Sequence, residues 1–180
     1  MSSLQKFHRR TNGGAPVAVK LIGSESVPAG AGFYLGKAGD GTSYMYVAPK
    51  STEAILTWGS QGTSRGTVST TNGLANTNTL VSFGTAAHPA AGRVKYLSTG
   101  GYNTWYLPAK DELMTLYSNK SATPFAAANS FGDLFYWSST ETGGYNGVYA
   151  NGHQMQTGFQ DWGASKGINS SVRAVRRSNI

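Results

Sequence analysis

The stretch YWSSTE, residues 136–141, has three consecutive hydroxyl side chains and a carboxylate, which could act as a nucleophile and an acid. A serine nucleophile needs a base such as histidine within hydrogen-bonding distance, and a strained Gly-x-Ser-x-Gly turn often presents it. Neither feature surrounds Ser138 or Ser139 in the sequence. We therefore interpret residues 136–140 as a strand with Trp137 in the core, and Glu141 as the start of a loop.

Other groups that could do chemistry are badly spaced for it. His8, His88 and His153 lie tens of residues apart, without the i, i+4 spacing or neighbouring carboxylate of a metal site or a catalytic base. Asp111 and Glu112 are adjacent, so on a helix their side chains diverge by about 100° and instead favour the positive end of the helix dipole. There is no cysteine. We predict no catalytic residue, no metal site and no cofactor, so the chain is not expected to be an enzyme.

Residues 142–163 instead combine aromatic rings with amides, a pattern typical of recognition surfaces. Aromatic rings stack on sugar rings, while amides and carboxylates hydrogen-bond to hydroxyl groups. Because strands bury alternate residues, we expect Tyr149 and Phe159 in the core, and Tyr145 and Trp162 exposed. The alternatives are that these loops bind nothing, or that they contact a neighbouring subunit. The candidate ligand-binding residues are Tyr145, Asn146, Asn151, His153, Gln154, Gln156, Asp161 and Trp162.

The composition indicates a folded domain with a polar, weakly charged surface. Charged residues make up 13% of the chain, about half the usual share. The chain is nevertheless rich in aromatic residues, with 7 Phe, 10 Tyr and 4 Trp, which a disordered chain would lack. Ser, Thr, Asn, Gln and Gly must therefore form most of the surface, and this composition favours β-structure with long loops.

The net charge of +7 is concentrated at the two ends of the chain. Six of the 15 basic residues lie in the first ten or last eight positions, which leaves nine basic against eight acidic residues between them. This nearly neutral body does not favour nucleic-acid binding. No stretch is apolar enough to enter a membrane or to act as a secretory signal. We expect residues 1–14 to be an extended attachment arm, with Lys6, Phe7, Arg9 and Arg10 as its contact residues.

Local patterns predict the elements that position these groups. The clearest is a helix over residues 108–119, with Pro108 in its first turn and Leu113, Leu116 and Tyr117 in one apolar stripe. Residues 60–73 are predicted as a Gly/Ser/Thr-rich loop. Two further helices are predicted over residues 73–84 and 89–101, and strands over 16–22, 32–36, 43–49, 54–59, 104–108 and 170–178.

Four segments together resemble the Lcl C-terminal domain family: residues 73–81, 100–119, 136–141 and 172–176. The resemblance covers roughly residues 32–177. It implies an α+β, C-type-lectin-like domain with two helices around a twisted antiparallel sheet, and with a long loop region as the binding face. The carbohydrate-binding triplets of calcium-dependent lectins are absent, so we expect no calcium-dependent mechanism.

The resemblance also implies particular roles. Trp105, Leu107 and Pro108 would lead into the helix whose leucines pack on the sheet. The strand with Arg173 and Arg176 would lie in the same sheet as Trp137, and we expect an arginine of this strand to pair with Glu141, because a half-buried carboxylate needs a partner.

We therefore divide the chain into an N-terminal attachment segment, residues 1–31, and a lectin-like domain, residues 32–180. Family members occur on bacteriophage virions and bacterial surface proteins. The leading hypothesis is a bacteriophage virion protein (tail fibre, collar or capsid decoration), made in the host cytoplasm without a signal peptide. Its expected partners are other virion subunits, a host surface glycan or protein, and further copies of itself in a homo-oligomer. The alternatives are a bacterial surface adhesin and an enzyme built on a related fold.

Overall fold

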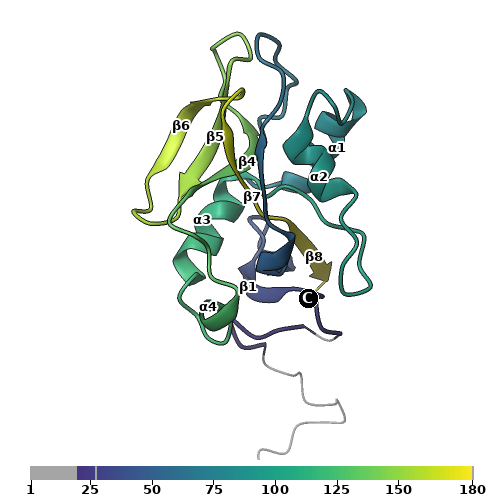
Figure 1. Cartoon of the computed structure of the whole chain (residues 1–180), viewed down its shortest axis with the longest axis vertical. Helices are drawn as coiled ribbons and strands as arrows, with labels where there is room; N and C mark the ends of the chain where they lie inside the picture. Colours follow the sequence, from purple (N-terminus) through teal and green to yellow (C-terminus); the bar gives the residue numbers. More distant parts are fainter. Residues whose placement is uncertain (1–19, 27, 180) are drawn as a thin grey trace, which may run out of the picture.

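The structure, a computed structural model, describes residues 20–26 and 28–179 and has an α+β architecture (Figure 1). The four α-helices of the described residues follow one another in the middle of the chain, and the strands before and after them form two separate open sheets. The helices are η1 (Lys50–Thr52), α1 (Gly73–Ser82), α2 (Pro89–Lys95), α3 (Lys110–Asn119) and α4 (Phe125–Ala128). The strands are β1 (Phe33–Lys37), β2 (Ser43–Val47), β3 (Ala54–Thr57), β4 (Phe135–Glu141), β5 (Tyr149–Gln154), β6 (Gln160–Ser165), β7 (Asn169–Val172) and β8 (Val175–Asn179).

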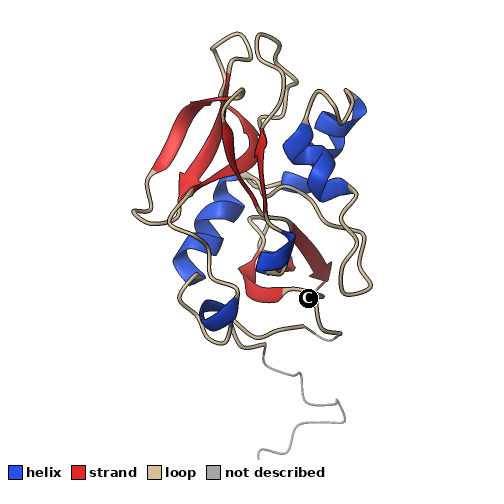
Figure 2. Ribbon diagram, in the orientation of Figure 1, coloured by secondary structure: helices blue, strands red, loops and turns tan. Residues whose placement is uncertain are grey.

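The larger sheet has five strands in the order β3-β7-β4-β5-β6. Its neighbours are antiparallel except for β4 and β7, which pair in parallel where Tyr136 faces Ser171. The smaller sheet has the order β1-β2-β8 and is antiparallel (Figure 2). The last strand, β8, therefore pairs with β2, which lies more than a hundred residues earlier in the sequence.

Two hydrophobic clusters hold the helices against the sheets. The first joins α3 and α4 to the smaller sheet and to one face of the larger one, through residues such as Leu113, Leu116 and Tyr136. The second joins α1 and α2 to the opposite face of the larger sheet, where Trp137 is buried with Trp58. Trp137 is buried as predicted, and so are Leu113 and Leu116 on α3; Trp105 and Leu107, which lead toward α3, are buried as well.

We predicted two helices around a single twisted sheet, and this part of the predicted fold is wrong, because the described residues form two sheets and several helices. The segment 170–178 is not one strand but two, because β7 ends at Val172 and β8 begins at Val175 in the other sheet. Arg176 thus lies in a different sheet from Trp137. Arg173, at the crossing point, is buried and donates to the carbonyls of Ala48 and Asn129.

Several predicted boundaries also shift by a few residues, and one predicted strand is lost. The second helix ends at Lys95 instead of residue 101, because the chain then turns through a bridge between Thr99 and Tyr102. The helix expected at Pro108 begins at Lys110, because Ala109 is still extended. The strand expected over 104–108 is reduced to one bridge between Tyr106 and Val175.

The predicted attachment arm, with Lys6, Phe7, Arg9 and Arg10, lies outside the described residues, as does most of the strand predicted over 16–22. The described residues 20–22 do not belong to a strand. Within residues 20–26 and 28–179, none of the helices is both long and apolar enough to cross a membrane.

Candidate ligand-binding site

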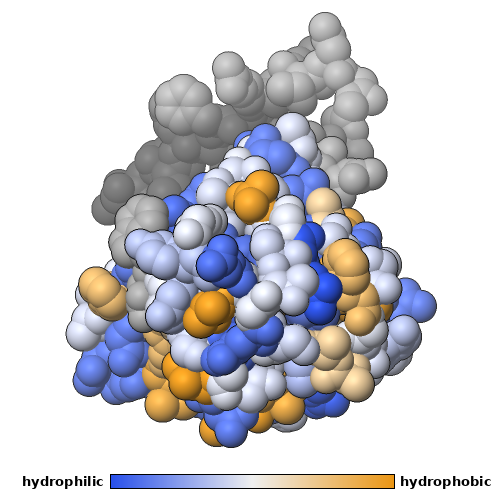
Figure 3. All heavy atoms as spheres, turned by 90° about the horizontal axis from the view of Figure 1, so that it is seen from above, coloured by the Kyte–Doolittle hydropathy of each residue, from blue (hydrophilic) through white to orange (hydrophobic). Residues whose placement is uncertain are grey.

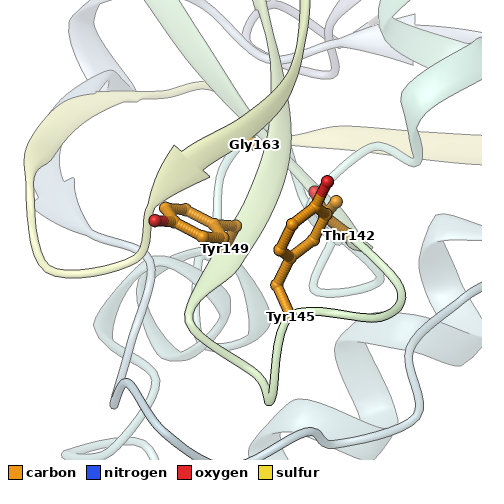
Figure 4. Close-up of a pocket in the computed structure, with 4 residues that line it drawn as sticks. All are labelled: Thr142, Tyr145, Tyr149 and Gly163. Atoms are coloured by element: carbon orange, nitrogen blue, oxygen red, sulfur yellow. The ribbon is translucent and has the colours of Figure 1, made fainter.

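An open hollow of about 380 Å³ lies at the loop end of the larger sheet. We call it the tyrosine hollow, and its lining residues are Thr142, Tyr145, Tyr149 and Gly163. The rings of Tyr145 and Tyr149 stand almost perpendicular, at 85°, with their centroids 5.5 Å apart. Figure 4 shows the two rings turned toward one another, with Thr142 beside Tyr145 and Gly163 on the neighbouring strand. The hollow therefore offers two aromatic surfaces and their hydroxyl groups to a ligand.

The 142–148 loop, which connects β4 to β5, carries Tyr145. It is closed at its base by a hydrogen bond from the Thr142 amide to the Tyr149 carbonyl, 3.2 Å long. Within the loop, the Val148 amide donates to the Tyr145 carbonyl at 3.0 Å. Asn146 adopts a left-handed backbone conformation with φ 49°, which asparagine tolerates better than most residues. Tyr145 is thus presented by a tight, internally bonded turn, and its side chain is 59% exposed.

A second loop, the 60–68 loop, packs against the 142–148 loop. The two loops lie side by side at the top of the molecule (Figure 1). Gly147 is buried against this loop: a Cβ atom at its position would lie 2.1 Å from the Thr63 carbonyl carbon. Gly147 also has a φ of 70°, so glycine is required here for both reasons. Seen from above, this loop end is mainly hydrophilic, with small isolated hydrophobic areas (Figure 3).

Glu141 ties the two loops together. Its carboxylate accepts hydrogen bonds from the Ser64 hydroxyl at 3.0 Å and from the amides of Arg65 and Thr67 at 2.8 and 3.3 Å. It also forms an ion pair with the Lys166 ammonium, and the two side chains are 2% and 0% exposed. The prediction that an arginine of the last strand pairs with Glu141 is therefore wrong. Glu141 ends β4 instead of opening a loop, which points its carboxylate toward β6 and the 60–68 loop.

Hydrogen bonds and the neighbouring ammonium keep Glu141 ionised. Burial disfavours the carboxylate, but the hydrogen bonds from Lys166 and from the Arg65 amide outweigh it and hold the pKa of Glu141 below its usual value. The Lys166 ammonium also lies over the Trp58 ring, 4.4 Å from its centroid. His88 accepts a hydrogen bond from Arg65 at 3.2 Å, and burial together with the charges of Arg65 and Lys166 lowers the pKa of His88 to about 4. This imidazole is therefore neutral at pH 7.

Only part of the predicted ligand-binding set lies at the hollow. Tyr145 is exposed as expected, and Asn146 is exposed beside it. Asn151 and His153 are buried, so their assignment to an exposed binding surface is wrong. Both lie on β5, an interior strand of the sheet, and His153 packs against Tyr117 of α3 with ring centroids 4.8 Å apart.

Other predicted residues lie at the opposite end of the β5–β6 hairpin. Gln154 ends β5, about 17 Å along the strand from Tyr149, and the exposed Gln156 follows it in the turn. Phe159, expected in the core, is 62% exposed in the same turn. Tyr149, also expected in the core, is half-buried and lines the hollow. Asp161 and Trp162 lie on β6, and their side chains are outside the described part of the structure.

The candidate residues did not include Thr142, Gly163 or Lys166, and the predicted 60–73 loop was given no role in the site. The length of that loop was the available signal, because connections of this length are uncommon unless they are functional. No local signal marked Lys166, because its partner lies 25 residues earlier in the chain.

The described part of the chain is thus an α+β domain with an aromatic-lined hollow in its loops. The sequence model of the Lcl C-terminal domain family matches residues 50–176. This match spans well over half of the 180 residues, so the chain belongs to the Lcl C-terminal domain family. The comparison with curated proteins found no match.

Proposed function

We propose that this protein is a non-catalytic recognition module of a bacteriophage particle, which binds a neutral sugar of the host surface in the tyrosine hollow. The observation that carries the proposal is the perpendicular pair of Tyr145 and Tyr149 around an open hollow. One of these rings can stack on a sugar ring while the other contacts its edge, and the tyrosine hydroxyl groups can meet the sugar hydroxyls. The described lining residues Thr142, Tyr145, Tyr149 and Gly163 are uncharged, which suits a neutral ligand.

Three further features support this proposal. Membership of the Lcl C-terminal domain family fits a surface or structural protein. The weakly charged composition, rich in Gly, Ser, Thr and Asn, suits a protein exposed on a particle. His88 and His153 are both buried, so neither imidazole can reach a substrate as a catalytic base. The basic arm, residues 1–14, would then attach the module to the particle.

A sugar titration tests the proposal on the isolated protein. Glucose, galactose, mannose and N-acetylglucosamine are added separately to isotope-labelled protein, and NMR shifts are followed at Tyr145 and Tyr149. We expect one of these sugars to bind with a Kd on the order of 1 mM, because an open hollow buries few ligand atoms.

Matched variants assign the binding to the hollow. Tyr145→Ala should weaken binding about tenfold or more and reduce adsorption of particles to host cells. Tyr96→Ala removes a tyrosine that is 74% exposed elsewhere, at the end of α2, and should change neither result. If Tyr145→Ala leaves adsorption unchanged but prevents particle assembly, the hollow is an interface between subunits and the proposal is wrong.

A further inference from the structure

We propose that Glu141 and Lys166 are positioning residues for the tyrosine hollow, and that they act by fixing the 60–68 loop behind Tyr145. This inference rests on the proposed function, because the hollow is the binding site named there. The pair does not line the hollow. Its importance follows from what the two residues hold in place through their side chains and backbone groups.

Glu141 binds the 60–68 loop at several points. Its carboxylate accepts the Ser64 hydroxyl and the amides of Arg65 and Thr67, and its own amide donates to the Thr67 carbonyl at 2.8 Å. Except for the Ser64 hydroxyl, these contacts are to the backbone of the loop, so they fix its path at Arg65 and Thr67 whatever side chains those two residues carry. One strand-end residue therefore determines where residues 64–67 lie.

Lys166 connects the same carboxylate to the second loop. Its ammonium binds Glu141, and its amide donates to the Val148 carbonyl at 3.1 Å, at the end of the 142–148 loop. Its carbonyl accepts from the Trp58 amide at 3.0 Å, where the chain enters the 60–68 loop. Lys166 thus contacts the start of one loop and the end of the other.

The contact between the two loops connects the position of the 60–68 loop to the position of Tyr145 in the hollow. Gly147 lies directly against Thr63 and Ser64, and Tyr145 is two residues away in the same tight turn. If the 60–68 loop moves, this support is lost and the Tyr145 ring no longer has a fixed place opposite Tyr149. A ring that must be ordered on binding costs affinity, whereas a ring that is already ordered does not.

The Glu141–Lys166 ion pair is fully buried, which is an uncommon place for two charged side chains. A buried pair adds little net stability compared with apolar side chains of the same volume, so its presence here calls for another use. Glu141 needs four hydrogen bonds to hold a loop that has no regular secondary structure, and the Lys166 charge keeps that carboxylate ionised. The function we assign to the pair is the preorganisation of the loops.

Hydrogen–deuterium exchange of the free protein tests this inference without any ligand. In Glu141→Gln, exchange of the Arg65, Thr67 and Val148 amides should become about tenfold faster or more, because charge-assisted hydrogen bonds are lost. Glu112→Gln is the matched control, since Glu112 is an equally buried carboxylate that binds the Gly73 and Ala109 amides. It should accelerate exchange at those two amides and leave Arg65 and Val148 unchanged.

A second variant separates loop position from the buried charge. Gly147→Ala keeps both charges but forces a methyl group against Thr63, so it should accelerate the same loop amides. Both variants should also weaken the binding of whichever tested sugar binds the wild type. If no sugar binds, the proposed function fails while the exchange result still decides the role of the pair.

Two results would overturn the inference. In the first, Glu141→Gln leaves the Arg65 and Val148 amides within about twofold of wild type, which would show that the loops are held by other contacts. In the second, exchange rises equally across the domain, including at Gly73 and Ala109. The pair would then support the whole fold and not the loops.

Discussion

Individual residues of the YWSSTE stretch show how one strand serves both the core and the site. Trp137 is buried between the larger sheet and the α1–α2 layer, and its indole donates to the Leu56 carbonyl at 3.1 Å. Four residues later, Glu141 points its carboxylate into the loops. The hydroxyl groups between them are also used structurally, since Ser138 donates to Asn151 and Thr140 donates to Ser69.

Replacing Trp137 with alanine should therefore lower the free energy of unfolding by about 3–5 kcal/mol, because the change removes buried area and leaves a cavity. Urea unfolding followed by circular dichroism measures this loss. Tyr96→Ala, at an exposed position, should cost less than about 0.5 kcal/mol. A Trp137→Ala protein that unfolds like the wild type would show that Trp137 is not a core residue.

The buried histidines make stability depend on pH. The pKa of His88 is about 4 in the folded protein, below its ordinary value of 6.5, so the unfolded chain takes up this proton first as pH falls. The stability from neutral His88 is thus fully present above pH 6.5 and is lost as pH falls toward about 4, a loss of up to about 3 kcal/mol. His153 acts in the same direction, because burial and the Lys120 charge lower its pKa.

Unfolding measured between pH 7 and pH 4 should therefore show a steady loss of stability. In His88→Gln, which still can accept from Arg65 but does not titrate, the slope should be visibly shallower. An unchanged slope would mean that other groups, such as Glu141, determine the acid sensitivity. Glu141 itself contributes at lower pH, since its depressed pKa means that its stabilisation is lost only as pH falls through that value.

At the scale of elements, the two adjacent carboxylates in the first turn of α3, Asp111 and Glu112, have different roles. Glu112 accepts from the Ala109 and Gly73 amides at 2.8 and 3.2 Å, and so links the first turns of α3 and α1. It also binds Arg177 of β8 at 2.7 Å. Asp111 lies in the same turn and is only partly buried, which fits the simpler helix-dipole role.

We predict that Glu112→Ala costs about 3–5 kcal/mol, because it leaves Arg177 without its buried partner and frees two helix amides. Asp111→Ala should cost no more than about 1 kcal/mol, through the helix dipole alone. Thermal unfolding of the two variants under identical conditions makes the comparison. Equal losses would mean that Glu112 contributes only its charge.

This contrast shows what the sequence could and could not predict. The position of α3 could be read from Pro108, the acidic first turn and the leucine stripe, all of which are local signals. The distinct role of Glu112 could not, because its partner Arg177 is 65 residues away. The same limit applies to Glu141 with Lys166, and to Asn151 and His153. Alternation shows which residues share a face of β5, but not that α3 covers the face carrying His153.

At the scale of the whole molecule, the loop end and the smaller sheet lie at opposite ends (Figure 1). The loop after β4, which carries Tyr145, is at the top, and the smaller sheet with β1 and β8 is in the lower half, on the side where the described chain begins at residue 20. This polarity suits the proposed function, because a module attached at one end would present its hollow outward at the other. Many copies on one particle would offset a weak affinity at each site.

The last prediction concerns the attachment arm. The first hydrogen bonds of the described chain that bind it to the body are made by Gly23, whose amide donates to Tyr34 and whose carbonyl accepts from Phe125. Both hydrophobic clusters consist of residues from Phe33 onward. Deleting residues 1–14 removes none of these contacts, so we expect a truncated protein with an unchanged melting temperature and sugar titration. Particles produced with the truncated protein should lack it, because Lys6, Phe7, Arg9 and Arg10 are gone.

A variant with Lys6, Arg9 and Arg10 changed to serine is the control that keeps the length of the arm, and it should also fail to join the particle. A truncated chain that does not fold would place the arm in the body of the domain, and normal incorporation would place the attachment surface elsewhere.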